Sequence, residues 1–168
     1  MQGVQKKIEA ARLCADNLKI RFRLVGSGQD SEKVRKLAEQ YKLSNIEFIG
    51  RVSLVELNAY MAEADVVLGI FGDTPKAKRA IPNKVYEGMA VRRPVITMDT
   101  PAVREIFSDN EIVLVKNDPD SIARSVLKLS NDKKLCEQIS KSGYEKACLY
   151  KPVMIARSLI DIILKYEK

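Results

Sequence analysis

Short β-branched apolar runs alternate with amphipathic stretches along this chain, and one such pair takes about twenty residues. Parallel strands need a long crossover connection, which is usually a helix, so this alternation limits the folds available to the chain. It predicts an α/β protein with a doubly wound, mostly parallel, Rossmann-like sheet that carries helices on both faces. The expected strands are residues 20–25, 46–49, 66–70, 94–98 and 112–115.

Apolar residues at helical spacing predict helices between these strands and after the last one. In the first helix, Val4, Ile8 and Ala11 form the inner face, and Lys7 is expected to face solvent with the other charged residues. Residues 72–79 are expected to form a loop. The expected helices are residues 4–16, 31–41, 54–64, 82–91, 101–107, 119–129, 132–150 and 152–168.

The third helix has the clearest start signal in the chain. Ser53 is followed three residues later by Glu56, which is the spacing of a capping box. The buried side of this helix is expected to consist of Leu57, Tyr60, Met61 and Ala64.

The composition excludes several classes of function. The 168 residues fit one domain, and no apolar run approaches the roughly 20 residues of a membrane span. Cys14, Cys136 and Cys148 have no disulfide or metal-ligand spacing, and no signal peptide opens the sequence, so we expect a cytoplasmic protein without a bound metal. Histidine is absent, which argues against a Ser/His mechanism or a zinc site.

A net charge of +7 indicates an anionic partner. The lysines and arginines are spread along the chain, and no nucleic-acid-binding motif accompanies them, so nucleic acid is not expected as a partner. An acidic small molecule fits this charge, as does an acceptor at a membrane surface, which would place the protein peripherally at that face.

Residues 80–98 contain the most informative local pattern. Pro82 and Asn83 are expected to open a short helix, with Asn83 as N-cap, and an apolar strand follows from Pro94. Helical side chains lean toward the N-terminus, so the Glu87 carboxylate can accept hydrogen bonds from a diol near the start of its own helix. The unpaired N–H groups at that start suit a phosphate. The alternative is that Glu87 only pairs with Lys84.

With these elements placed, the sequence resembles the carboxyl-terminal, donor-binding domain of the group 1 retaining GT-B glycosyltransferases. The resemblance covers nearly the whole chain, and it depends on the order and spacing of several motifs rather than on any one of them. These are Gly3-Val4 before the first helix, RFRLVGSGQD, NIEFIGRVSLVEL, AEADVVL, IPNKVYEGMAVRRPVIT and DPDSIARSVLKL.

The resemblance implies a role for nine residues. Glu87 would bind the donor ribose, and the backbone at Asn83, Lys84 and Val85 would face the diphosphate. The other implied positions are Arg51 and Val52 at the nucleobase, Gly26 and Gly28 in a turn beside the nucleotide, and Arg79 in a segment that reaches toward the sugar. The alternatives are that the two glycines only permit a positive φ and that Val52 only belongs to the core.

The chain departs from the family pattern in three ways. Arg79 stands where the family often has a second glutamate, and Val91-Arg92-Arg93 replaces the usual glycine after the helix. Gln2 stands where the family has a phosphate-binding lysine, and the usual central first strand is lacking. The acceptor-binding amino-terminal domain is lacking as well, so residues 1–168 correspond to a single GT-B half-domain.

We therefore expect the donor-binding half of a glycosyltransferase, with no catalytic residue assigned within this chain. The resemblance implies retaining transfer from a nucleotide-diphospho-sugar to an acceptor hydroxyl, with no metal or other cofactor. The alternative is a non-catalytic fragment or interaction module with the same fold. Its partners would be the missing amino-terminal half, a second chain, or another copy paired through exposed sheet edges.

Overall fold

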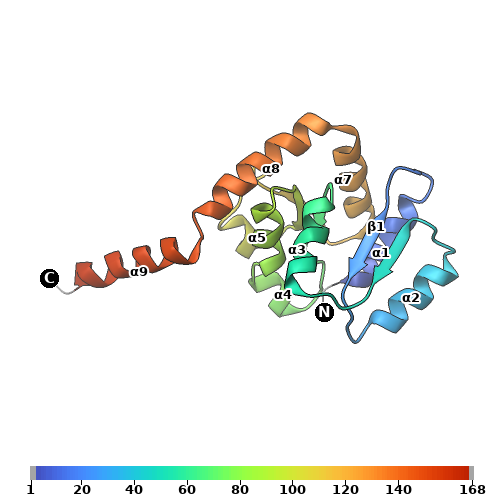
Figure 1. The fold of residues 1–168 in the computed structure, drawn as a ribbon, viewed down its shortest axis with the longest axis horizontal. Coiled ribbons are helices and arrows are strands. Elements are labelled where there is room, and N and C mark those ends of the chain that lie inside the picture. The colour runs from blue at the N-terminus through green and yellow to red at the C-terminus, as the bar shows by residue number, and fades with distance from the viewer. Residues whose placement is uncertain (1–2, 167–168) are drawn as a thin grey trace.

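The structure of the protein is a computed structural model, which describes residues 3–166. Gln2 therefore lies outside the described residues, as does the end of the last expected helix. Strands and helices alternate as predicted (Figure 1). The strands are β1 (Phe22–Val25), β2 (Ile46–Ile49), β3 (Val67–Leu68), β4 (Val95–Met98) and β5 (Val113–Val115). The helices are α1 (Val4–Leu13), α2 (Ser31–Gln40), α3 (Leu54–Glu63), α4 (Pro75–Arg79), α5 (Asn83–Ala90), α6 (Pro101–Arg104), α7 (Pro119–Asn131), α8 (Lys133–Cys148) and α9 (Pro152–Tyr166).

Every strand pairing is parallel, which confirms the predicted fold class. The pairings form two separate sheets, one with the order β1-β2 and one with the order β3-β4-β5. In the first sheet Phe22 lies opposite Ile46, and in the second Ile96 lies between Leu68 and Val113. No pairing among residues 3–166 joins β1 to β3.

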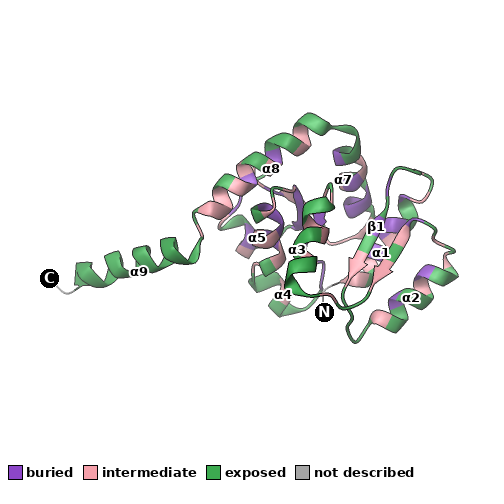
Figure 2. Cartoon of the chain, viewed as in Figure 1, coloured by how far each residue is buried: buried purple, intermediate pink, exposed green. Residues whose placement is uncertain are grey.

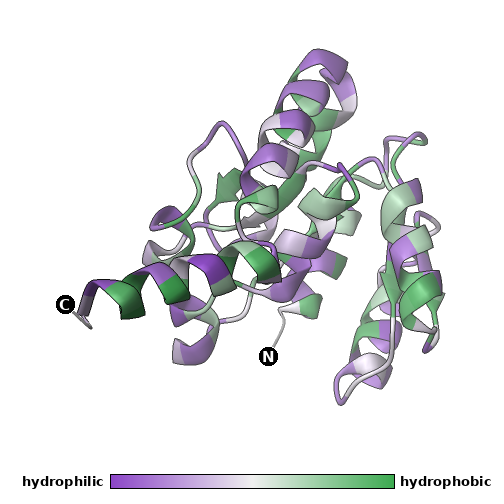
Figure 3. Ribbon diagram, turned by 60° about the vertical axis from the view of Figure 1, so that its left-hand side comes forward, coloured by the Kyte–Doolittle hydropathy of each residue, from purple (hydrophilic) through white to green (hydrophobic). Residues whose placement is uncertain are grey.

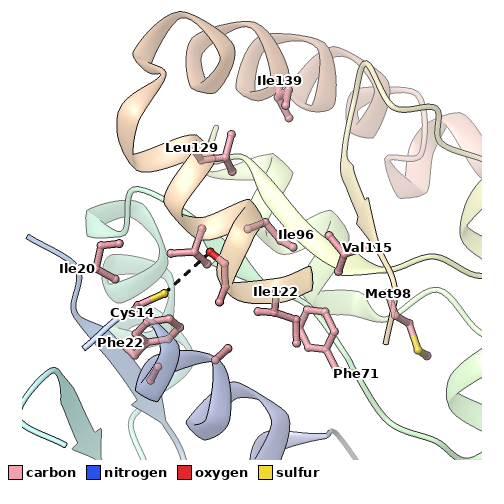
Figure 4. Close-up of a cluster of buried hydrophobic side chains, with 14 residues drawn as sticks. Cys14, Ile20, Phe22, Phe71, Ile96, Met98, Val115, Ile122, Leu129 and Ile139 are labelled. Carbon is pink, nitrogen blue, oxygen red and sulfur yellow. Dashed lines mark hydrogen bonds between the residues drawn. The ribbon is translucent and has the colours of Figure 1, made fainter. Parts of the chain in front are cut away.

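A shared hydrophobic core holds the two sheets together. All four residues of β4 are buried, as expected for a parallel strand that is covered on both faces. The main cluster also contains Phe22 from β1, Phe71 from the segment after β3, and Ile122 from α7 (Figure 4). The Cys14 thiol donates a hydrogen bond to the Ala123 carbonyl and so connects α1 with α7. The sheets therefore belong to one domain although their strands do not pair.

Two expectations about α3 and β3 are wrong, and they have the same cause. The capping box of Ser53 and Glu56 is present, but no residue of α3 is fully buried, and its expected inner residues are only half-buried. β3 spans two residues instead of the expected five. Both elements border the gap between the sheets, so each lacks packing or pairing on one side. The half-buried residues that face this gap are Leu57, Tyr60, Met61 and Ala64.

The last helix projects from the rest of the molecule. α9 is exposed over its whole length (Figure 2) and has a broad apolar face (Figure 3). Ile155, Leu159, Ile162 and Ile163 lie on this face and are about half exposed, at 49–56%. No helix within residues 3–166 is both long enough and apolar enough to cross a bilayer.

The end of α5 contains a left-handed residue that is not glycine. Arg92 has φ +57° and lies in the Val91-Arg92-Arg93 segment that stands in place of the glycine expected from the family resemblance. This conformation destabilises an L-residue by about 1–2 kcal/mol relative to the right-handed one. The Arg92 guanidinium lies 4.2 Å from the centre of the Tyr144 ring, and this contact offsets part of the cost.

We predict that Arg92→Gly is more stable than Arg92→Ala by about 1 kcal/mol, because both variants lose the ring contact and only glycine relieves the backbone. Equilibrium denaturant unfolding measures the difference. The matched control is Ala90→Gly in the same helix, where glycine should destabilise by about 1 kcal/mol. An Arg92→Ala variant as stable as Arg92→Gly would contradict the argument.

Candidate functional site

A large cavity lies between the two sheets, and we call it the inter-sheet cavity. Its volume is about 1390 Å³. It is bordered by β1 and β3 and lined by side chains from α1, α3, α5, α7 and α8. Among the lining residues are Lys7, Val25, Lys84 and Glu87. The cavity therefore brings the carboxyl end of β1 together with α5, which carries several of the sequence-predicted site residues.

The position of Glu87 follows from the packing of α5. Val85 and Met89 are fully buried against the core, as the sequence pattern predicted. A β-carbon at Gly88 would lie 2.8 Å from Cγ2 of Val95, so the helix lies very close to β4. Glu87 then faces the inter-sheet cavity and is half-buried. No residue among 3–166 donates a hydrogen bond to its carboxylate, which leaves both oxygens available as acceptors.

The start of α5 differs in detail from the prediction. Pro82, not Asn83, is the N-cap residue, and Asn83 is the first helical residue. The expectation that Asn83 caps the helix is therefore wrong, because the extended backbone of Pro82 already ends the preceding segment. No side chain caps this helix. The Asn83 side chain is exposed, so the first turn remains accessible.

Lys84 and Glu87 interact through their charges. Burial lowers the pKa of Lys84, and the negative charge of Glu87 partly opposes this effect. No direct ion pair between the two side chains is present among the described residues. The alternative that Glu87 only pairs with Lys84 therefore rests on this charge interaction.

Lys7 is a candidate site residue that the sequence analysis missed. It was expected to face solvent, and this is wrong: it is only 8% exposed and lines the inter-sheet cavity. Its Nζ donates a 3.4 Å hydrogen bond to the Leu68 carbonyl and lies 5.7 Å from the centre of the Phe71 ring. Burial, together with the positive charge of Lys84, lowers the pKa of Lys7 to about 7. Its spacing from Val4 and Ala11 was the available signal, because it places Lys7 on the inner face of α1.

The predicted residues after β1 and β2 lie at the carboxyl end of the two-stranded sheet and do not line the inter-sheet cavity. Gly26 has φ +112°, so glycine is required there by the backbone. Gly28 has no such φ, and its N–H donates to Ser31 Oγ at 2.6 Å. The exposed Arg51 donates from Nε to Ser27 Oγ at 2.9 Å, whereas Val52 is half-buried.

The segment that contains Arg79 is helical, so the expected loop over residues 72–79 is wrong. Thr74 caps α4 by accepting a hydrogen bond from the Ala77 N–H, and Pro75 occupies the first turn. Thr74 followed by Pro75 could have been recognised in the sequence as the start of a helix. Arg79 ends α4, is exposed, and does not line the inter-sheet cavity. The preceding turn is held by Asp73, which pairs with Lys6 at 2.6 Å.

Potential metal-ligating side chains are not clustered in the part of the chain that the structure describes. No group of three or more histidine, cysteine, aspartate or glutamate side chains is placed there to hold an ion. Within residues 3–166, the candidate site therefore combines the Glu87 carboxylate, the start of α5 and two desolvated lysines, Lys7 and Lys84, around one cavity. Such a set suits a ligand that carries both hydroxyl groups and phosphate.

Comparison with known proteins identifies the family. The sequence model described as "Glycosyl transferases group 1" matches residues 1–146. The chain belongs to this family. A relative of this group 1 chain is an uncharacterised glycosyltransferase, MJ1178, of Methanocaldococcus jannaschii, with 27% identity over 146 residues. Another is the putative colanic acid biosynthesis glycosyltransferase WcaL of Salmonella typhimurium, with 30% identity over 155 residues. The match covers 86% of this chain in both cases, but only 39% of MJ1178 and 37% of WcaL.

Solved structures show the same fold. The C-terminal domain of a group 1 family protein, LpcC, from Francisella tularensis has a TM-score of 0.76 at 25% identity, covering 90% of this chain and 80% of that one. Anabaena HepE, solved in complex with UDP and glucose, has a TM-score of 0.82 at 17% identity. That match covers 98% of this chain and 45% of HepE, so this group 1 chain corresponds to about half of that structure.

The buried Lys7 predicts a specific pH dependence of stability. Its pKa is about 7 in the folded state and 10.5 in the unfolded chain. Between these values the unfolded state binds more protons, so the free energy of unfolding rises with pH, on the order of 1 kcal/mol per pH unit. Lys7→Met lacks this dependence and should be more stable than wild type at pH 7, by a margin that narrows toward pH 10.5.

Denaturant unfolding of both proteins across this range measures the margin. The exposed Lys128→Met variant serves as the control for loss of a lysine charge without burial. A margin for Lys7→Met that does not change with pH would contradict the buried position of the Lys7 amine.

Proposed function

We propose that residues 1–168 are the donor-binding half of a glycosyltransferase that takes a nucleotide-diphospho-sugar as donor. The observation that carries the proposal is the half-buried Glu87 carboxylate, to which no residue among 3–166 donates a hydrogen bond and which lies one turn from the start of α5. A vicinal diol such as ribose supplies two hydroxyl donors, which matches a carboxylate with two available oxygens. The Anabaena protein of the same fold, solved with UDP and glucose, is in keeping with this ligand class.

The diphosphate would lie at the start of α5. The N–H groups at Asn83 and Lys84 and the helix dipole favour negative charge there, whereas the N–H of Val85 already donates to the Pro82 carbonyl at 2.9 Å. Lys84 and Lys7 add positive charge from the same cavity. Because burial lowers the pKa of both amines, an incoming phosphate would favour their protonated forms and gain strong electrostatic attraction.

In the complete enzyme, we propose retaining transfer of the sugar to an acceptor hydroxyl. Charge develops on the leaving diphosphate in such a reaction, and preorganised N–H groups and cations stabilise it without a metal. The acceptor-binding half would come from polypeptide outside these residues. The net charge of +7 favours an acceptor at an anionic membrane surface, with the protein bound peripherally.

We also propose contacts outside the inter-sheet cavity. Arg51 and Val52 would meet the nucleobase, and the turn at Gly26 and Gly28 would let the nucleotide lie close to the backbone. Arg79 is the last residue of α4 and does not line the inter-sheet cavity. Its proposed contact therefore requires the donor sugar to extend out of this cavity toward α4. We assign none of these residues a catalytic role.

A thermodynamic cycle tests the Glu87 contact. Wild-type protein should bind one of UDP, GDP or ADP, and Glu87→Gln should weaken that binding about 10- to 100-fold through loss of charge-assisted hydrogen bonds. Wild type should bind the 2′-deoxy form of the same nucleotide similarly weakly. Glu87→Gln should bind both forms alike, because the hydroxyl no longer meets a carboxylate. Calorimetric titration gives all four affinities.

The matched control is Glu105→Gln, which removes the same charge at an exposed position outside the cavity. It should bind like wild type, and thermal unfolding should show that all variants remain folded. The proposed site would be refuted if wild type bound none of the three nucleotides. It would also be refuted if Glu87→Gln bound the 2′-deoxy form more weakly than the ribose form by the same factor as wild type.

A further inference from the structure

α4 is an exposed and strongly basic helix just ahead of α5. Three of its five residues are basic, and Lys76, Lys78 and Arg79 are all exposed. Ala77 packs against the main hydrophobic cluster, so the basic side chains lie on the outer side of the helix. Lys76 and Arg79 are three residues apart and therefore share one face.

The carboxylates next to α4 already have partners within the protein. Asp73, just before this helix, accepts hydrogen bonds from Lys6 Nζ at 2.6 Å and from an asparagine side chain at 2.9 Å. Asp99 lies just before α6, which neighbours α4, and it accepts two hydrogen bonds from Arg104 at 2.6 and 2.7 Å. The local acidic side chains are thus held by cations that do not belong to α4.

Lys76 and Arg79 are the two cations of α4 that lack an anionic partner in the described structure. Lys78 contributes to the lowered pKa of Asp73, so it lies near that carboxylate. No ion pair among residues 3–166 includes Lys76 or Arg79. We call these two residues the α4 cation pair.

The proposed donor orientation directs the sugar toward α4. Glu87 would hold the ribose and the start of α5 the diphosphate, so the donor runs toward the N-terminus of this helix, which rises about 6 Å from Asn83 to Glu87. The sugar then lies beyond Asn83, beside the residues that precede the helix. Ala80 and Pro82 in this connection are extended. Arg79 is four residues before Asn83 and so at most about 14 Å from it, which a hexose and an extended arginine side chain can bridge.

The α4 cation pair suits a carboxylate better than a neutral sugar. A hydroxyl group both donates and accepts hydrogen bonds, whereas arginine and lysine side chains only donate. The hydroxyl protons of a neutral sugar would therefore find no acceptor on these two side chains. A carboxylate has two acceptor oxygens, and one guanidinium can bind both of them.

We propose that the donor sugar carries a carboxylate, as in a nucleotide-diphospho-uronic acid, and that Arg79 and Lys76 bind this group. The inference rests on the proposed function, because Glu87 and the start of α5 give the direction in which the donor lies. Arg79 is then a specificity-determining residue, which selects the acidic sugar over its neutral counterpart and does not hold the diphosphate.

Calorimetric titration with a matched pair of donors tests this selectivity. UDP-glucose and UDP-glucuronate differ only at C6, which is a hydroxymethyl group in the first and a carboxylate in the second. The same pair on GDP or ADP is used where that nucleotide binds. Wild type should bind the carboxylate form about tenfold more tightly. Arg79→Gln should reduce this preference to about twofold, and a double variant that adds Lys76→Gln should abolish it. Both variants should bind the free nucleotide like wild type.

The matched control is Arg157→Gln, the same substitution on the exposed α9. It should keep the preference of wild type. This control separates a contact at α4 from a general attraction between an acidic sugar and a chain of net charge +7. Thermal unfolding shows whether all variants remain folded.

Two results would overturn the inference and leave the nucleotide site intact. One is a wild type that binds both donors alike, and the other is an Arg79→Gln variant that keeps the full preference. Equal weakening of the free nucleotide and both donors by Arg79→Gln would also overturn it, because the guanidinium would then contact the diphosphate. If none of the three free nucleotides bound to wild type, the proposed function would be refuted, and this inference with it.

Discussion

The close contact between α5 and β4 at Gly88 determines where the candidate site lies. The position cannot hold a side chain without displacing Val95 or Val67, so the helix lies directly on the sheet. Val85 and Met89 complete the buried face, and Glu87 is consequently held at the wall of the inter-sheet cavity. The site is thus a consequence of core packing, and the hydrophobic effect that stabilises α5 also orients its carboxylate.

Desolvated cations give this cavity its chemical character. Lys7 and Lys84 are held where water is scarce, and burial lowers the pKa of each. Burial of these amines lowers the free energy of unfolding of the protein without ligand, and it favours binding of an anion. Such a loss of stability is common at functional sites. Membership of the group 1 glycosyl transferase family is consistent with a ligand that combines a diphosphate with hydroxyl groups.

The sequence was sufficient to predict the elements whose signals are local or fully buried. β2, the α3 capping box and the buried strand after Pro94 have the predicted positions, because periodicity and capping chemistry determine them. Features that depend on neighbouring elements were not predicted. β3 is short and α3 half-buried because both border a gap, and Lys7 is buried because α1 packs between other elements. Of the predicted site residues on α5, Lys84 and Glu87 line the inter-sheet cavity, whereas Asn83 and Val85 do not. Arg79 and the predicted residues after β1 and β2 do not line it either.

The gap between the sheets and the candidate site share one cavity, which Lys7 lines and where its amine donates to the Leu68 carbonyl. The central claim is that the first turn of α5 and Glu87 jointly hold the nucleotide. Titration of labelled protein with UDP, GDP and ADP, followed by amide and side-chain carboxyl chemical shifts, tests it directly. The account predicts that the largest shifts occur at the amides of Asn83, Lys84 and Val85 and at the Glu87 carboxyl carbon. The claim would be contradicted if the chemical shifts at these four positions stayed unchanged while those at other positions changed.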